Sequence, residues 1–127
     1  MRNFIISVIC LGTLIAVWAA FDSYSAGKIS GYKETLQQEV IKMAEDEEWD
    51  KAYTIFQQFS EDWARYKKIA AFFLDTQAIN EADYSIAKSC YYIKAKDVSN
   101  STGELSCLRE QLTFLEYNES LAAGNIF

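Results

Sequence analysis

The 127-residue sequence contains no histidine, which removes much of the catalytic and metal-binding chemistry available to small proteins. Without an imidazole there is no Ser-His-Asp or Cys-His nucleophile, no HExxH zinc site and no Glu-x-x-His iron site of the kind built into four-helix bundles. The chain also lacks a CxxC pair, a GxxxxGK[ST] loop and a GxGxxG motif. We therefore expect a protein that is not an enzyme and that holds neither a metal nor a cofactor.

Proline is absent too, and only five glycines are present. Long helices are therefore permitted, whereas residues that form β-turns are scarce. Basic charge is also in short supply, since the formal net charge is −6, and this balance argues against nucleic acid as a partner. By contrast, 50% of the residues are hydrophobic and 15% are aromatic, which is too much apolar surface for a disordered polypeptide.

The uncharged stretch FIISVICLGTLIAVWAAF runs from Phe4 to Phe21. Ten of its residues are Ile, Leu, Val or Phe, and as a helix it would measure about 27 Å, close to the thickness of a bilayer core. A cleaved signal peptide is the alternative, but such segments usually have a shorter apolar region and a more basic start than Arg2 and the amino terminus provide. We interpret residues 1–24 as a retained transmembrane anchor in the lipid bilayer.

The charges that flank this segment predict its orientation, because Arg2 precedes the span and Asp22 follows it. The positive-inside tendency then places the N-terminus in the cytoplasm and the rest of the chain outside, as a single-pass protein of the cell membrane. Trp18, Phe21 and Tyr24 would lie near the outer interface, where aromatic residues gather.

Three small residues within the span suggest a contact surface. Gly12, Ala16 and Ala20 are spaced four residues apart and share one helix face, on which another transmembrane helix could pack closely. The alternative is that glycine and alanine are simply common in single spans, so that their spacing has no meaning.

Behind the span, two glycines and three serines in residues 23–33 predict a flexible joint at 25–31, although a continuous helix remains the alternative because proline is absent. Residues 32–127 would form the extracytoplasmic domain. We expect its first helix over roughly Tyr32–Glu45 and its second from the acidic run at 45–50 onward. The third would begin after Asp75, and the fourth at Ser101, which forms a capping box with Glu104. The predicted fold class is all-α: an N-terminal transmembrane helix followed by a small antiparallel bundle of about four helices.

Apolar residues in alternating steps of three and four predict the bundle core. The second helix of the domain carries one such seam, made of Trp49, Ala52, Phe56, Phe59, Trp63, Tyr66, Ala70 and Phe73. The last helix carries Leu105, Leu108, Leu112 and Leu115. We expect Gly124 to end this helix, and Ile126 and Phe127 to pack back on the bundle or to contact a partner.

Two cysteines, Cys90 and Cys107, lie on consecutive predicted helices, nearly equidistant from the joint between them. In an antiparallel hairpin they would face each other, so a disulfide is one interpretation if the domain lies outside the cell. The other is two buried free thiols that act as small hydrophobic side chains.

Several segments carry a resemblance to a known family: EDWARYKKIAAFFLD, YIKAKD, ELSCLREQLTFLEYNESL and the terminal GNIF, behind an uncharged span. Together they resemble the bacterial domain of unknown function 4363 family over nearly the whole chain. The resemblance implies a small, single-span helical protein without an assigned activity. It also implies a membrane partner, because members are often encoded beside a small multi-pass membrane protein. Members often carry a histidine near the position of Gln77, so a metal or proton role resting on that imidazole is in doubt here.

Three functions remain after these exclusions. We favour a membrane-anchored, non-enzymatic accessory module that binds another membrane protein through its span and its bundle. The alternative is an extracytoplasmic peptide- or ligand-binding bundle that uses a groove of surplus aromatics, namely Tyr53, Tyr84, Tyr91, Tyr92 and Tyr117. An enzyme working with carboxylates alone would need three or more buried, facing Asp or Glu side chains, for which the apolar seams leave little room.

Overall fold

The computed structural model describes the backbone of residues 1–126 and the side chains of residues 1–117. Within these residues the chain is helical and contains no strand, so the predicted all-α class is confirmed. The elements are α1 (Arg2–Thr35), a π-helical turn η1 (Leu36–Val40), α2 (Ile41–Glu45), α3 (Trp49–Ala70), α4 (Thr76–Lys94) and α5 (Val98–Ile126). The predicted terminal residues Ile126 and Phe127 lie outside the described side chains.

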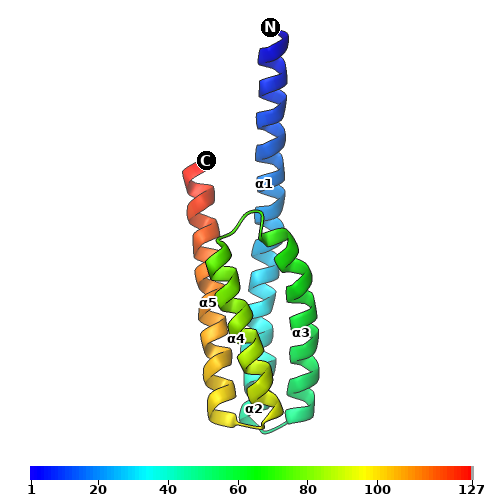
Figure 1. Ribbon diagram of the computed structural model, residues 1–127, viewed down its shortest axis with the longest axis vertical. Coiled ribbons are helices and arrows are strands. Elements are labelled where there is room, and N and C mark those ends of the chain that lie inside the picture. Colours follow the sequence, from blue (N-terminus) through cyan, green and yellow to red (C-terminus); the bar gives the residue numbers. More distant parts are fainter. Residues whose placement is uncertain (127) are drawn as a thin grey trace.

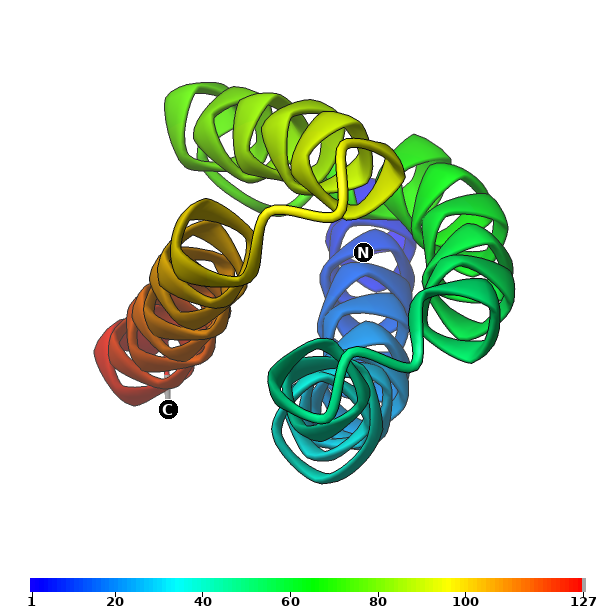
Figure 2. The ribbon, with the colours of Figure 1, turned by 90° about the horizontal axis from the view of Figure 1, so that it is seen from below.

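The helices form an up-and-down bundle with one long projection (Figure 1). α1, η1 and α2 run as one arm, and α3, α4 and α5 follow in alternating directions. α1 packs against α3 and α5, and α4 packs against the same two helices from the other side, as the view from below shows (Figure 2). The N-terminal half of α1 extends beyond the bundle, at the end where the α3–α4 loop lies (Figure 1).

The flexible joint predicted at 25–31 is wrong, because α1 passes through it without interruption. Two residues of this segment, Ser25 and Ile29, are buried against the rest of the bundle. The glycines and serines of this stretch favour a loop when taken alone, and tertiary contacts therefore keep it helical. As a result, the projecting segment and the bundle share one continuous helix.

The core follows the predicted seams closely. Phe56, Phe59, Trp63 and Tyr66 of α3 are buried, whereas Trp49 and Phe73 at the two ends of that seam are only partly buried. The four leucines of α5, Leu105, Leu108, Leu112 and Leu115, are completely buried. Burial of large apolar side chains contributes about 1.5–3 kcal/mol each, so this core is the main source of stability.

Polar contacts fix α1 against α3 beside this core. The hydroxyls of Ser25 and Tyr66 are hydrogen-bonded at 2.5 Å. Farther along α1, Tyr32 donates its hydroxyl hydrogen to Asp62 at 2.7 Å, and Lys28 forms an ion pair with the same carboxylate at 3.0 Å. Partial burial alone would raise the pKa of Asp62, but the hydrogen bonds from Tyr32 and Lys28 outweigh it and hold that pKa below its usual value. Asp62 therefore remains ionised and holds the two helices in register.

The helix ends differ from the predictions in two places. Asp97 caps α5, because its carboxylate accepts a hydrogen bond from the backbone N–H of Asn100 at 3.0 Å, which also lowers the Asp97 pKa. The capping box predicted at Ser101 is therefore wrong, since Ser101 lies inside the first turns of α5. At the other end, α5 continues past Gly124, where we had expected it to stop.

The continuity of α1 leads to a first prediction. Gly27 is helical and exposed, and a Cβ placed there would meet nothing within 4 Å. Gly27→Ala should therefore raise the free energy of unfolding by about 0.5–1 kcal/mol, because alanine loses less backbone entropy in a helix. Urea unfolding of the full chain in detergent measures the change. A flexible joint would show no gain, and a loss of stability would contradict the open space around Gly27.

The Asp62 contacts lead to a second prediction. Asp62→Asn should lower the free energy of unfolding at pH 7 by about 1–3 kcal/mol, because Lys28 and Tyr32 lose a charged partner. Since folding lowers the pKa of Asp62, its stabilising effect is present above the unfolded value of about 3.9 and is lost as the pH falls through the folded value. The difference between variant and wild type should therefore shrink below about pH 4. Glu61→Gln, an exposed neighbour, is the control and should show neither effect.

Candidate interaction surface

The projecting half of α1 is apolar and uncovered by the bundle. All residues from Met1 to Val17 are exposed, including Leu14 at 68%. The most apolar window of this helix has a mean hydropathy of 2.5, and only 6% of it is buried. Such a segment is long and apolar enough to cross a membrane.

The three small residues of the span lie on the side of α1 that faces away from the bundle. Successive residues advance by about 100° around a helix, so Gly12, Ala16 and Ala20 lie opposite Leu14 and Trp18. Trp18 packs on the ring of Phe73 in the α3–α4 loop, with ring centroids 5.4 Å apart. The predicted packing face is therefore exposed and unobstructed by the bundle loop.

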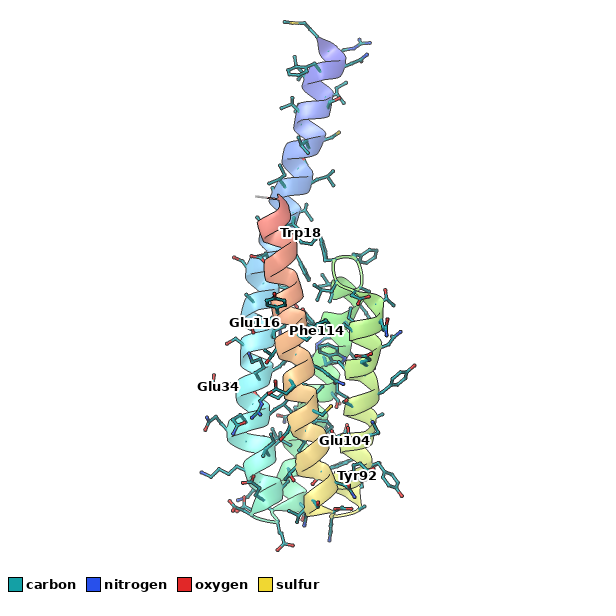
Figure 3. The ribbon with its side chains drawn as sticks, turned by 90° about the vertical axis from the view of Figure 1, so that its left-hand side faces the viewer. Trp18, Glu34, Tyr92, Glu104, Phe114 and Glu116 are labelled. Atoms are coloured by element: carbon teal, nitrogen blue, oxygen red, sulfur yellow. The ribbon has the colours of Figure 1, made fainter. Side chains whose placement is uncertain are left out.

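This face continues beyond the span, which our interpretation of the sequence missed. Ser23, Gly27 and Ser30 lie in the same angular sector as the three small residues of the span, and all are exposed. Glu34 follows on the same side and points away from the bundle (Figure 3). The spacing of small residues in the sequence marks the whole stripe, but the predicted joint at 25–31 excluded Gly27 and Ser30 from it. We call residues 12, 16, 20, 23, 27 and 30 the outer face of α1.

Glycine on this face needs an explanation that the bundle does not supply. Each glycine inside a helix costs about 1 kcal/mol relative to alanine. Such a cost is usually offset where a neighbouring backbone must approach closely. Gly12 and Gly27 nevertheless have open space where a Cβ would lie, as do Gly31 of α1 and Gly103 of α5, and none of the four has a positive φ angle. Within the described chain, therefore, nothing makes use of their small size.

A second exposed feature lies on the opposite side of the span, at the end of the bundle. A hollow of about 360 Å³ is lined by apolar side chains of α1 and of the α3–α4 loop. Its lining residues are Leu11, Leu14, Ile15, Val17, Trp18, Phe72 and Phe73. Phe73 stacks on Phe21 with ring centroids 4.1 Å apart, whereas Phe72 is 85% exposed.

The surplus tyrosines do not converge on one groove. Tyr84, Tyr91 and Tyr117 are exposed, the first two on α4 and the third on α5. Tyr92 contacts Tyr91 at a ring separation of 5.9 Å. Tyr53 instead lines a separate hollow of about 270 Å³ near the far end of α3, together with Trp49, Asp50, Thr54, Ile93, Lys94 and Lys96.

The three cysteines are free thiols in this structure, which therefore does not contain the Cys90–Cys107 disulfide that was one of the two interpretations. Cys90 is partly buried, and its Sγ accepts a weak hydrogen bond from Gln57 Nε2 on α3 at 3.5 Å. Cys107 is exposed, because it lies on α5 away from the face that carries the buried leucines. The two side chains therefore point toward different surroundings.

The acidic side chains that contact other helices serve as cross-links between them. Asp83 of α4 accepts hydrogen bonds from Trp63 Nε1 at 2.7 Å and from Lys67 at 3.0 Å, and both of these residues belong to α3. Lys33 of α1 pairs with Glu116 of α5 at 3.2 Å. Among the described residues, no group of three or more His, Cys, Asp or Glu is placed to hold a metal ion.

Comparison with known proteins places this chain in a family. No curated protein and no solved structure matches it. The family model of the domain of unknown function DUF4363 matches residues 23–126, from just after the apolar segment to the last described turn of α5. That match confirms the resemblance seen in the sequence, and the chain belongs to the DUF4363 family.

Proposed function

We propose that this protein is a membrane-anchored, non-enzymatic module that binds another membrane protein through the outer face of α1. The projecting apolar half of α1 supports the membrane anchor, because lipid is the natural surrounding for a helical segment whose most apolar window has a mean hydropathy of 2.5 and is only 6% buried. The outer face is the surface that a second helix would contact. No part of this proposal requires a metal, a cofactor or a reaction.

The observation that carries the proposal is the position of the glycines. Gly12 and Gly27 fall on one exposed face of one helix, with open space where a side chain would be. In membranes, where helices gain no hydrophobic driving force by associating, small residues allow the close backbone approach that stabilises helix pairs. A partner helix lying along this face would offset the cost of both glycines.

The continuity of α1 gives the partner a way to reach both parts of the protein. The outer face begins within the span at Gly12 and continues to Ser30, beside the bundle. A membrane protein with a helix that emerges from the bilayer could therefore contact the span and the bundle along one surface. This arrangement fits an accessory subunit better than it fits a free ligand-binding domain.

We further propose that the bundle is extracytoplasmic and that the N-terminus is cytoplasmic, at the cell membrane. Arg2 precedes the apolar segment and Asp22 follows it, which is the distribution that the positive-inside tendency favours. Ligand binding in an aromatic groove has less support, because Tyr84 and Tyr91 are exposed on α4, Tyr117 is exposed on α5, and Tyr53 lines a different hollow.

Photo-crosslinking from single positions tests the partner surface. A diazirine amino acid at Ala16 or at Gly27 should capture the same membrane protein in native membranes, because both positions lie on the outer face. The same probe at Leu14, on the opposite side of the span, is the matched control and should yield mainly lipid adducts. Equal capture from all three positions would contradict a specific face, and lipid alone from Ala16 would contradict the partner.

The native thiols test the orientation. Cys107 is exposed on α5, so in a Cys90→Ala variant it should react with a membrane-impermeant maleimide added to intact cells. Cys10, within the apolar segment, should remain unlabelled because the charged reagent does not enter hydrocarbon. Labelling of Cys107 only after cell lysis would place the bundle in the cytoplasm and overturn the proposed orientation.

A further inference from the structure

Phe72 is an unusual residue for the surface of a bundle. It is 85% exposed, and it lies in the short α3–α4 loop at the end of the bundle from which α1 projects. Together with Leu14 and Trp18 it lines the apolar hollow beside the span. An exposed phenylalanine therefore borders the same hollow as residues of the apolar segment.

The length of the uncovered helix sets where a bilayer must end. Phe4 to Val17 comprises fourteen residues, which as a helix measure about 21 Å. The hydrocarbon core of a bilayer is about 30 Å thick, so this apolar and uncovered part of α1 is shorter than the core by about 9 Å. The remaining thickness of the hydrocarbon core would contain Trp18 and Phe21, and both of these residues pack on Phe73 of the loop.

We infer that the α3–α4 loop is a second membrane anchor, with Phe72 inserted at the boundary between the headgroups and the hydrocarbon of the bilayer. The inference rests on the proposed membrane anchoring and adds that the bundle lies against the lipid surface. The occupant of the hollow beside Phe72 is lipid, because its walls continue the apolar surface of the span.

The residues around the loop suit such a position. Trp18 lies at the base of the projecting helix (Figure 3), and aromatic residues are favoured at membrane interfaces. Lys68, in the last turn of α3, is exposed, and a long basic side chain can extend toward lipid phosphates while its stem lies against apolar groups. Because Phe73 and Trp18 are in ring contact, the loop and the span would enter the interface as one unit.

Spin labels at single positions test this inference in the full chain. In a background with Cys10, Cys90 and Cys107 replaced by alanine, a nitroxide is placed at position 72, at position 14 in the span or at Glu47 in the turn at the far end of the bundle. The labelled proteins are reconstituted in vesicles of phosphatidylcholine and phosphatidylglycerol. Collision with oxygen, which concentrates in lipid, is compared with collision with a water-soluble nickel chelate.

The ratio of oxygen to nickel collisions should be several-fold higher at position 72 than at position 47, and higher still at position 14. Longer acyl chains should increase the ratio at position 72, because a thicker core covers more of the loop. A label at position 72 that behaves like position 47, while position 14 remains in lipid, overturns the second anchor and leaves the proposed function standing. Labels in water at both positions 14 and 72 overturn the membrane anchoring as well.

Discussion

The packing of α1 determines the rest of this structure. The half of the helix that follows Phe21 supplies Ile29 to the core, and the π-helical turn η1 that continues it supplies Leu36 and Val40; all three are completely buried. The half that precedes Trp18 makes no such contacts and stays apolar and exposed. Because the two halves belong to one helix, the forces that fold the bundle also set the direction in which the apolar segment leaves it.

Around its circumference, α1 divides its contacts among three kinds of surroundings. One side enters the core, and its neighbours Lys28 and Tyr32 are held on Asp62 of α3. Lys33 extends to Glu116 of α5. The third side contains the outer face, with small residues from the span to the bundle. Where α1 contacts the other helices of its own chain, it does so through charged side chains as well as packed ones. The outer face, by contrast, carries no charged residue before Glu34.

The bundle core was predictable because its signal is periodic. Phe56, Phe59, Trp63 and Tyr66 repeat at the spacing of a helix face, and that spacing reports burial directly. The joint at 25–31 was not predictable by composition, because Gly27 and Gly31 look the same in a loop and in a helix held by its neighbours. The burial of Ser25 and Ile29 determines that this segment is helical, and that burial depends on residues of α3 and α5 that are distant in the sequence.

Cys90 and Cys107 show a similar limit. The helix pattern correctly placed them on consecutive helices of one hairpin, but their distances from the joint do not fix how far each helix is rotated about its own axis. The rotation that buries the leucines of α5 turns Cys107 toward solvent, and the rotation of α4 brings Cys90 to Gln57 of α3. The outer face was found only in part for a related reason, since its recognition required α1 to be continuous.

Because α1 is uninterrupted, any inclination of its N-terminal half also moves the far end of the helix. From Arg2 to Thr35 it comprises 34 residues, or about 51 Å of helix. If the membrane segment inclined by about 20°, which is an average value for transmembrane helices, the far end of this rod would be displaced sideways by about 17 Å. The inclination of the membrane segment, which is set by packing against neighbouring helices and by residues at the interface, would thus determine where the far turns of the bundle lie along the membrane plane.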